Sequence, residues 1–417
     1  MCDEYKLKFE VYMKKKILLL TTIYPAKDIV ISNNTSVVHY FAKEWVRQGN
    51  QVLVVHNYPV YLRMLHWIAR FADKLIASKF NTSVTTAFQK NDVEFEMDGV
   101  MVCRMPLFKP LPRFAVPRAH LERQVRKIAD FCKRNNFVPD VISAHNFYPH
   151  TEMLNKLKEQ FFPSAKTCVV VHKQRMKMLR FMQGSYQDQI RKIDVWGYRS
   201  LPLKREFEKY TNYIPPRQFL CYSGIPVHFL NRTDCCVISK PINKFVYVGS
   251  FIRRKYPEKL LMAIKKCGLN EFCLDYVGDG VNRPIIEGIV RRENWLDKVK
   301  LHGFVDREQV PFFISQAQCF VMISEEETFG LVYLEAMSMG CITVASRNEG
   351  MEGIIEDGVN GFLCKAGDEH ELAAIIAKIN SLNIQDLKKI SENAKQTALR
   401  LTDENVAKMY LDGVLNG

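Results

Sequence analysis

Four glutamates lie close together around one predicted helix in the C-terminal half of the chain. Glu325, Glu326 and Glu327 are consecutive in a polar loop, and the helix-patterned segment 331–339 that follows contains Glu335. Glu335 comes eight residues after Glu327, about two helical turns, and so returns to a similar face. The free N–H groups at a helix start favour an anionic group. One site could hold a sugar near Glu327, a phosphate at the helix start and a ribose diol at Glu335. Alternatively, the glutamates are solvated or cap the first turn of a buried helix.

The elements that must position these glutamates form a strand–loop–helix–strand unit. Continuous apolar runs at 319–323 and 341–345 are typical of strands buried on both faces. Between them lie the polar loop 324–330 and the helix, which Gly340 ends. Because open α/β sheets bind ligands just outside the carboxyl ends of their strands, this loop is expected at a ligand-binding edge.

The spacing of Glu327 and Glu335, written ETFGLVYLE, resembles the signature of family 4 retaining glycosyltransferases, which have the GT-B fold. Three flanking segments occur in the family's order: LHGFV, EAMSMGCITVAS and GMEGIIEDGVNGFL. The resemblance is strong from residue 246 to about residue 378 and weaker, though continuous, before that. It implies an α/β protein in which two Rossmann-like domains face each other across a cleft. It also implies transfer of a sugar from a nucleoside diphosphate sugar to a hydroxyl, with retention of configuration.

The resemblance assigns the donor site to the loop and helix of this signature. Glu327 is expected to act on the donor sugar or its phosphate, and Glu335 to hold the ribose. Thr328, Phe329 and Gly330 lie between them and are expected to line the same site.

A second donor-binding loop follows the predicted strand KFVYV. The family pattern there is VGR followed by Lys-Gly, whose arginine and lysine neutralise the donor diphosphate. This chain has Ser250 in place of the arginine, Lys255 in place of the lysine and Tyr256 in place of the glycine. We expect Lys255 to contact the diphosphate and Arg253 to supply the second cation, with Arg254 as the alternative.

Two further residues are expected to contribute to the donor site through their backbone. Gly249 ends the predicted strand before Ser250, and Val305 ends VKLHGFV, near whose last residues the backbone contacts the nucleotide base in relatives. Backbone contacts leave little trace in side chains, so the sequence does not identify the base. The resemblance requires no metal ion and no cofactor, because cationic side chains and the helix N-terminus stabilise the leaving diphosphate.

The N-terminal half begins with a strand–loop–helix–strand pattern, ILLLTTIYP to QVLVVH, as Rossmann-like domains do. The family's glycine pair is missing from its first loop, DIVISNNTS. His172 follows the apolar run VVV and matches the family's TVH segment, so we expect it in the active site, near the acceptor and the donor sugar. Alternatively, a lone histidine is usually a structural polar residue whose hydrogen bonds are made within the protein. His145, in PDVISAH, is expected to be structural.

These patterns predict the domain organisation. Residues 13–230 are expected to form an acceptor-binding Rossmann-like domain, 231–243 a linker, and 244–385 a nucleotide-sugar-binding Rossmann-like domain. Helices at 386–417 are expected to cross back to the first domain.

The composition limits the partners. The chain has 417 residues and a net charge of +14, without a nucleic-acid-binding motif, so we expect no nucleic acid. Phosphorylated substrates and anionic lipid account for the charge as well. The twelve cysteines lack zinc-site spacing and favour a reducing cytoplasm. No apolar run approaches the length of a transmembrane helix.

The segment 61–79, YLRMLHWIARFADKLIASK, offers two interpretations. It is a core-packing helix, with Trp67 and Phe71 buried, or an interfacial helix flanked by basic residues. The second interpretation predicts a cytoplasmic protein at the inner membrane face that takes a lipid-linked acceptor. The acceptor is otherwise a soluble glycan, and the pathway expected is surface polysaccharide synthesis.

Two other classes of protein remain open on sequence grounds. One is a nucleotide-sugar epimerase or a phosphorylase of the same fold, although such epimerases lack the ETFGLVYLE pattern. The other is a non-catalytic binder of a sugar nucleotide or an anionic surface.

Overall fold

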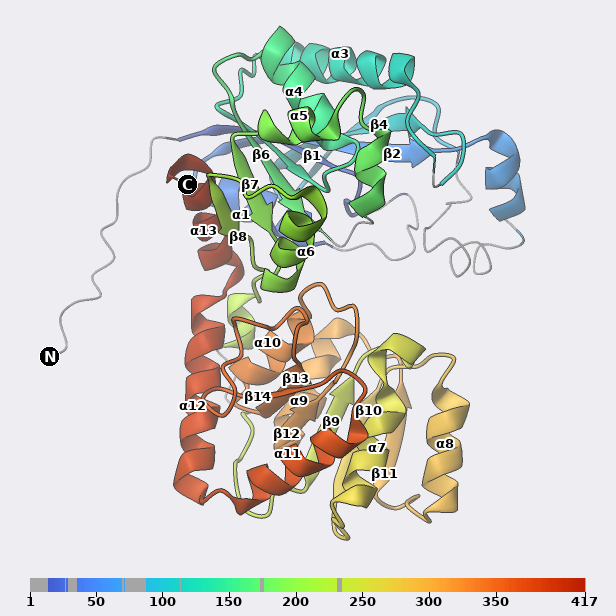
Figure 1. Ribbon diagram of the computed structural model, residues 1–417, viewed down its shortest axis with the longest axis vertical. Coiled ribbons are helices and arrows are strands. Elements are labelled where there is room, and N and C mark those ends of the chain that lie inside the picture. The colour runs from blue at the N-terminus through green and yellow to red at the C-terminus, as the bar shows by residue number, and fades with distance from the viewer. Residues whose placement is uncertain are drawn as a thin grey trace, which may run out of the picture. The chain divides into compact units, whose positions relative to one another are not determined.

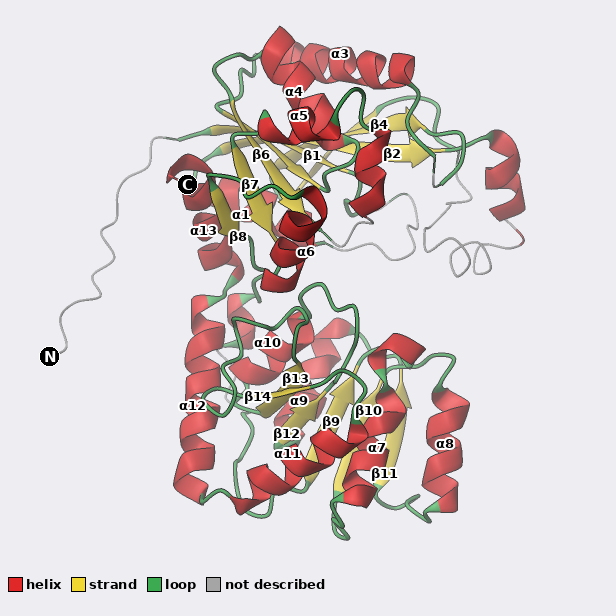
Figure 2. Ribbon diagram, in the orientation of Figure 1, coloured by secondary structure: helices red, strands yellow, loops and turns green. Residues whose placement is uncertain are grey.

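The computed structural model describes residues 14–26, 28, 36–69, 71, 88–112, 114–172, 176–230 and 235–416. The chain packs into two compact units, each built around its own sheet (Figure 1, Figure 2). The first comprises Met1–Gly197, Ile214–Phe219 and Leu411–Gly417, and the second comprises Tyr198–Tyr213 and Leu220–Tyr410. The linear domain boundaries at residues 230, 243 and 385 stay predictions, because this division follows packing rather than chain order.

The sheet of the first unit has eight strands in the order β3-β4-β2-β1-β5-β6-β7-β8. β3 is antiparallel to β4, whereas β4, β2, β1, β5 and β6 are parallel to one another. The apolar sequence of β1 is almost wholly buried, as a central strand covered on both faces requires. The strands are β1 (Lys16–Thr21), β2 (Gln51–Val60), β3 (Val93–Met97), β4 (Val100–Phe108), β5 (Val141–His145), β6 (Lys166–Val171), β7 (Val195–Tyr198) and β8 (Gln218–Leu220).

The first helix packs on this sheet through one apolar face. In α1, Val38, Phe41, Ala42 and Trp45 are buried at helical spacing, and Gly49, which has a positive φ of 88°, follows its end. The predicted strand–helix–strand beginning is therefore confirmed. Helices contributing to this unit are α1 (Val37–Arg47), the helical residues 63–69 and 71, α3 (Arg118–Arg134), α4 (His150–Gln160), α5 (Tyr186–Arg191), a 3₁₀ helix at Met176–Phe181 and the end of α13 (Asp403–Asn416).

The second unit has a six-stranded sheet in the order β11-β10-β9-β12-β13-β14, and every neighbouring pair is parallel. The chain builds β9, β10 and β11 towards one edge and then crosses over to build β12, β13 and β14 towards the other. The strand order therefore reverses between β9 and β12. The strands are β9 (Lys244–Val248), β10 (Cys273–Val277), β11 (Val299–Gly303), β12 (Cys319–Val321), β13 (Ile342–Ser346) and β14 (Phe362–Cys364).

Helices cover this second sheet. The helix that contains Glu335 of the ETFGLVYLE signature is α10. Its residues from Tyr333 to Ser338 are buried, because nearly all of its own side chains are apolar or small. The helices are α6 (Leu201–Thr211), α7 (Pro257–Lys266), α8 (Arg283–Arg292), α9 (Val310–Gln316), α10 (Leu331–Ser338), α11 (Glu369–Ser381) and α12 (Ile384–Arg400), with 3₁₀ helices at Val227–Phe229, Arg253–Lys255 and Arg307–Gln309.

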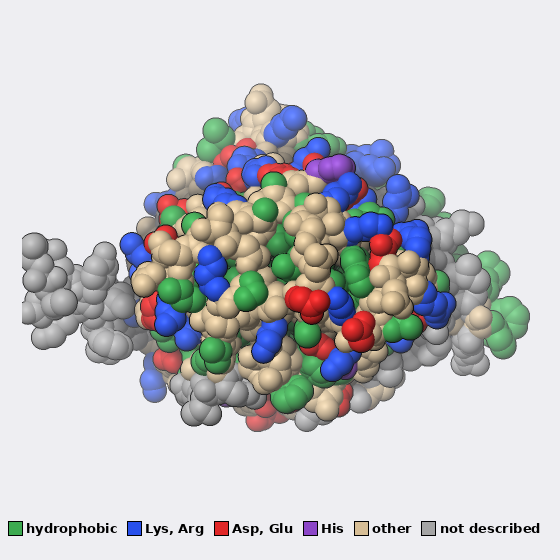
Figure 3. All heavy atoms as spheres, turned by 90° about the horizontal axis from the view of Figure 1, so that it is seen from below, with side chains coloured by type: hydrophobic (Ala, Val, Ile, Leu, Met, Phe, Trp, Pro, Cys, Tyr) green, Lys and Arg blue, Asp and Glu red, His purple; other side chains and the backbone are tan. Residues whose placement is uncertain are grey.

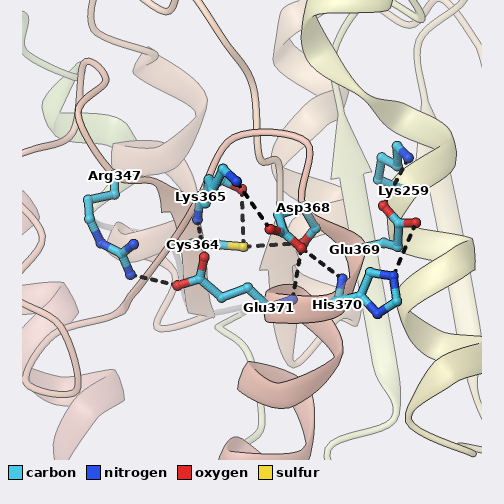
Figure 4. Close-up of polar contacts among 8 residues, drawn as sticks. All are labelled: Lys259, Arg347, Cys364, Lys365, Asp368, Glu369, His370 and Glu371. Carbon is cyan, nitrogen blue, oxygen red and sulfur yellow. Dashed lines mark hydrogen bonds and ion pairs between the residues drawn. The ribbon is translucent and has the colours of Figure 1, made fainter.

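A polar cluster joins the end of β14 to the start of α11 (Figure 4). The Asp368 carboxylate accepts hydrogen bonds from the backbone N–H groups of His370 and Glu371, both at 3.1 Å, and caps α11. The Glu371 carboxylate accepts instead from the Lys365 backbone N–H, at 2.8 Å, and from Arg347, at 2.7 Å. Asp368 therefore caps the helix, while Glu371 ties to it the residues that directly follow β13 and β14.

The cap predicts a stability change. Asp368→Ala should lower the free energy of unfolding by about 1 kcal/mol, because two backbone N–H groups lose their acceptor. His370→Ala is the matched control, because that residue contributes to the cap through its backbone. Urea unfolding of the three proteins measures the difference. Equal midpoints for Asp368→Ala and the wild type would show that water caps the helix equally well.

Candidate functional site

The predicted donor-site residues gather where the strand order of the second sheet reverses. Lys255 belongs to the loop that follows β9, and Glu327 belongs to the loop that follows β12, the neighbouring strand. Open α/β sheets bind ligands at such reversal points, outside the carboxyl ends of the strands. The topology therefore brings together two residues that are far apart in the sequence.

Lys255 and Glu327 form a partly buried ion pair. The Lys255 Nζ lies 3.7 Å from Glu327 Oε2, and the two side chains are 17% and 15% exposed. Burial holds the pKa of Lys255 below its ordinary value, and the Glu327 carboxylate opposes that shift. In the described part of the chain, the buried Oε2 of Glu327 has no hydrogen-bond donor within bonding distance. This oxygen is therefore suited to accept a hydrogen bond from a ligand.

Arg254, rather than Arg253, is the arginine beside this pair. Its Nη1 lies 3.9 Å from Glu327 Oε2 and 3.4 Å from the Glu325 carbonyl oxygen. Arg253 is exposed, and no ion pair joins it to Glu327 among the described residues. The geometry therefore favours Arg254 for the second cation, which the sequence assigned to Arg253.

The loops carrying these charges hold each other in place. The Glu325 backbone N–H donates to the Arg254 carbonyl oxygen, at 2.6 Å, and the Tyr256 hydroxyl donates to the Glu325 carboxylate, at 2.8 Å. Tyr256 has a φ of +46°, a left-handed conformation that favours glycine, the residue the family has at this position. A Cβ at Gly367 would lie 2.9 Å from its ring, so that glycine leaves room for the tyrosine.

Two predicted glycines fit the backbone at the site. Gly330 precedes α10 with a φ of +87°, and a Cβ there would lie 2.5 Å from the Tyr333 ring. The Tyr333 hydroxyl in turn donates to the Met322 carbonyl oxygen, at 2.7 Å, which holds the helix start on the end of β12. Gly249 lies beside the ion pair, because a Cβ there would lie 3.4 Å from Lys255 Nζ.

The other predicted donor residues occupy different environments. Phe329 is buried against Tyr222, with ring centroids 5.9 Å apart, and against the Arg199 guanidinium. It therefore supports the loop from within the second unit. Thr328 is half-buried and Ser250 is exposed, so both are open to a ligand.

Glu335 has a cationic partner that the sequence analysis did not find. The carboxylate is 4% exposed, and Arg307 Nη2 donates to its Oε1 at 2.8 Å. Burial raises the pKa of Glu335, and the charges of Arg307 and His228 oppose that shift. Arg307 comes two residues after the half-buried Val305. A basic residue in the loop predicted to contact the base was therefore the feature of the sequence that could have identified Arg307 as the partner of Glu335.

His172 lies in the first unit, just after β6. Its Nε2 is 2.7 Å from Nδ1 of His145, the last residue of β5. His145 is fully buried and stacks on Phe41, with ring centroids 5.8 Å apart. The residue expected to be structural is thus a direct hydrogen-bond partner of the predicted active-site histidine, and it fixes the position of that ring.

Several classes of site are missing from the part of the chain that the structure describes. No group of three or more His, Cys, Asp and Glu side chains there is placed to hold a metal ion. No helix among the described residues has the length and apolarity needed to cross a membrane. On the face shown in Figure 3, Lys and Arg side chains are interspersed with acidic and apolar ones. The absence of a metal requirement stays a prediction.

Comparisons with known proteins cover the part of the chain that carries these residues. Residues 237–397 match the family model described as Glycosyl transferases group 1, and this segment contains every donor-site residue above. An uncharacterized glycosyltransferase of Methanocaldococcus jannaschii is 29% identical over 200 residues, which are 46% of this chain and 53% of that protein. The lipopolysaccharide core biosynthesis glycosyltransferase LpsD of Rhizobium meliloti is 26% identical over 216 residues, 51% of this chain and 59% of LpsD. The matches thus span little more than half of these relatives.

The similarity in structure extends over both units. The Anabaena HepE structure in complex with UDP superimposes with a TM-score of 0.64 at 17% identity, covering 96% of this chain and 100% of HepE. Such structural neighbours are GT-B glycosyltransferases, so the predicted GT-B fold is confirmed.

The geometry ranks the cations of the site. Lys255→Ala should slow turnover by about 10²-fold, on the order of 3 kcal/mol in barrier, because a charged donor at a departing anion is lost. Arg254→Ala should reduce turnover by a comparable factor. Arg253→Ala, which changes the exposed neighbour, should reduce turnover only slightly. Steady-state rates of nucleotide release measure all three. A severe loss in Arg253→Ala with a mild one in Arg254→Ala would restore the assignment made from the sequence.

The pair of Arg307 and Glu335 predicts a pH dependence. Removing Arg307 should raise the pKa of Glu335 further, because the opposing positive charge is lost. In Arg307→Ala, the rise of nucleotide affinity with pH should therefore occur at higher pH than in the wild type. A carboxyl whose folded-state pKa is raised favours folding at low pH, so this variant should also lose stability as pH rises through that pKa.

Calorimetric titration with a nucleoside diphosphate, together with urea unfolding at several pH values, tests both effects. The double variant Arg307→Ala, Glu335→Gln is the control and should show neither dependence. Identical pH profiles for Arg307→Ala and the wild type would show that Arg307 does not influence the pKa of Glu335.

Proposed function

We propose that this protein is a family 4 retaining glycosyltransferase. It moves a sugar from a nucleoside diphosphate sugar to a hydroxyl of a glycan or lipid-linked acceptor, in surface polysaccharide synthesis. The observation that carries the proposal is the partly buried ion pair of Lys255 with Glu327 at the reversal point of the second sheet. The group 1 family match over this unit supports it, as do the lipopolysaccharide role named for LpsD and the UDP bound by HepE.

In this proposal each charged side chain has one task. Lys255 and Arg254, with the N-terminus of α10, hold the donor diphosphate and stabilise the negative charge that develops as it departs. Glu335 accepts hydrogen bonds from the ribose hydroxyls, and the unsatisfied oxygen of Glu327 accepts one from the donor sugar. His172, on the first unit, approaches the acceptor and the donor sugar.

Charge neutralisation by side chains leaves no task for a metal ion or a cofactor in this proposal. Retention requires that the acceptor oxygen bond to the anomeric carbon on the face from which the diphosphate leaves. We place the reaction in the cytoplasm, at the inner face of a membrane, where a lipid-linked acceptor is presented.

The proposal can be tested in two stages. A thermal-shift screen of nucleoside diphosphate sugars should reveal the donor, because a ligand at about 100 times its dissociation constant stabilises a protein by about 2.7 kcal/mol. With that donor, release of the nucleoside diphosphate should increase when an acceptor is added, and NMR of the product should show retained anomeric configuration.

Variants of the two glutamates serve as controls in the second stage. Glu327→Ala should reduce turnover more than nucleotide affinity, whereas Glu335→Ala should weaken nucleotide binding by about 1.5–3 kcal/mol, the usual contribution of a hydrogen bond to a charged group. Donor binding without release under any condition would identify a non-catalytic binder. Release that depends on inorganic phosphate would identify a phosphorylase.

A further inference from the structure

An outward-facing apolar surface lies on the first unit, which does not carry the candidate donor residues. We call the helical residues 63–69 and 71 the Trp67 helix. Large apolar side chains along it, and just before it, are exposed to solvent: Leu62 by 45%, Met64 by 64%, Trp67 by 61% and Phe71 by 78%. Met64, Trp67 and Phe71 are spaced by three and four residues, so they form one stripe along the helix.

The opposite side of the Trp67 helix is packed, so its orientation is fixed. Tyr61 and Ala69 are buried together, and Leu65 and Ile68 pack against them. The Tyr61 backbone N–H also donates to Nε2 of the buried His66, at 3.1 Å. The ring of the buried His66 also lies against that of Phe88, with centroids 5.4 Å apart, so one side of the helix packs on a residue outside it while the stripe on another side is exposed.

This arrangement bears on the two interpretations of segment 61–79, of which residues 70 and 72–79 lie outside the described residues. The core-packing interpretation, in which Trp67 and Phe71 are buried, is wrong, because both side chains are mainly exposed. Their rings contact each other, with centroids 5.6 Å apart. Figure 1 shows the helix at the right-hand edge of the first unit, and Figure 3 shows apolar side chains gathered at the same edge.

The charge distribution indicates what covers this surface. Residues 1–197 contain 31 Lys and Arg against 17 Asp and Glu, whereas residues 198–417 contain 28 of each. The whole net charge of +14 therefore belongs to the part of the chain that carries the Trp67 helix. A strongly cationic body favours an anionic partner, and exposed Trp and Phe on such a body suit the boundary between lipid headgroups and acyl chains.

We propose that the stripe of Met64, Trp67 and Phe71, with Leu62, inserts into an anionic lipid bilayer and docks the first unit on it. The basic side chains of the unit attract the bilayer, and the apolar stripe determines which face of the unit lies against it. This inference deepens the proposed function by naming the surface that meets the membrane of a lipid-linked acceptor, and it rests on that function only for its biological purpose.

Vesicle flotation of the full chain tests the surface directly. The protein should float with vesicles made of equal parts phosphatidylcholine and phosphatidylglycerol, and less so with phosphatidylcholine alone or at high salt. The double variant Trp67→Glu, Phe71→Glu should bind these vesicles at least about tenfold more weakly for each large apolar side chain removed. Phe312→Glu, which changes a 55% exposed aromatic residue of the second unit, is the matched control and should float like the wild type.

Two further measurements distinguish the outcomes. Tryptophan fluorescence should shift to the blue when anionic vesicles are added to the wild type, and lipids brominated in their acyl chains should quench it. The Trp67→Phe variant should keep flotation and lose most of that quenching. Nucleoside diphosphate affinity, which depends on the second unit, should be unchanged in all of these variants. Unchanged urea-unfolding midpoints should confirm that the first unit is folded in the Trp67 and Phe71 variants.

Several results would overturn the proposal. Flotation that is lost at high salt but survives Trp67→Glu, Phe71→Glu would mean that charge alone binds the protein. Dissociation of an oligomer by the same double variant would mean that a second copy of the chain covers the stripe. Absence of flotation, together with normal transfer to a soluble glycan, would remove the docking surface and the placement at a membrane, and would leave the proposed glycosyl transfer intact.

Discussion

Buried charge must be matched by nearby opposite charge, and the candidate donor site depends on this constraint. Lys255 and Glu327 lose much of their hydration where the loops after β9 and β12 meet, and each lowers the energetic cost of burying the other. Their separation of 3.7 Å is too long for a strong hydrogen bond, so the pair holds the loops together while both groups can still bind a ligand. A diphosphate arriving at Lys255 therefore meets a cation already fixed in position by the surrounding fold.

Glu335, the second carboxylate of the signature, is also buried beside a cation. Glu335 is more deeply buried than Glu327, and its cation comes from the loop after β11 rather than from the loop after β9. Because the ends of parallel strands share one edge of a sheet, loops distant in the sequence can supply each buried carboxylate with a partner. Arg307 is 38% exposed, so it can move with little loss of packing when a ribose approaches Glu335.

Local patterns in the sequence indicated part of the candidate site, but they do not contain the tertiary contacts that complete it. Apolar runs located the strands beside the candidate site, and the Glu-rich signature pointed to Glu327 and Glu335, whose roles stay predictions. The pairing of Arg307 with Glu335 spans 28 residues and depends on strand order, which periodicity does not contain. The choice between Arg253 and Arg254 depends on how a 3₁₀ turn directs adjacent side chains. Periodicity likewise showed that the Trp67 helix is apolar, but the face that packs is determined by tertiary structure.

The two halves of the chain use positive charge differently. In residues 198–417 cations and carboxylates are equal in number, and those at the candidate site lie within a few ångströms of each other, so attraction for a donor diphosphate acts at short range. In residues 1–197 the cations exceed the carboxylates by 14, and this excess cannot be neutralised by internal pairs. Its field extends about one Debye length, roughly 8–10 Å at physiological salt, and sums over a broad anionic surface. A summed field attracts without specifying orientation, so the orientation of this unit on such a surface must come from directional features, of which the outward stripe of the Trp67 helix is one.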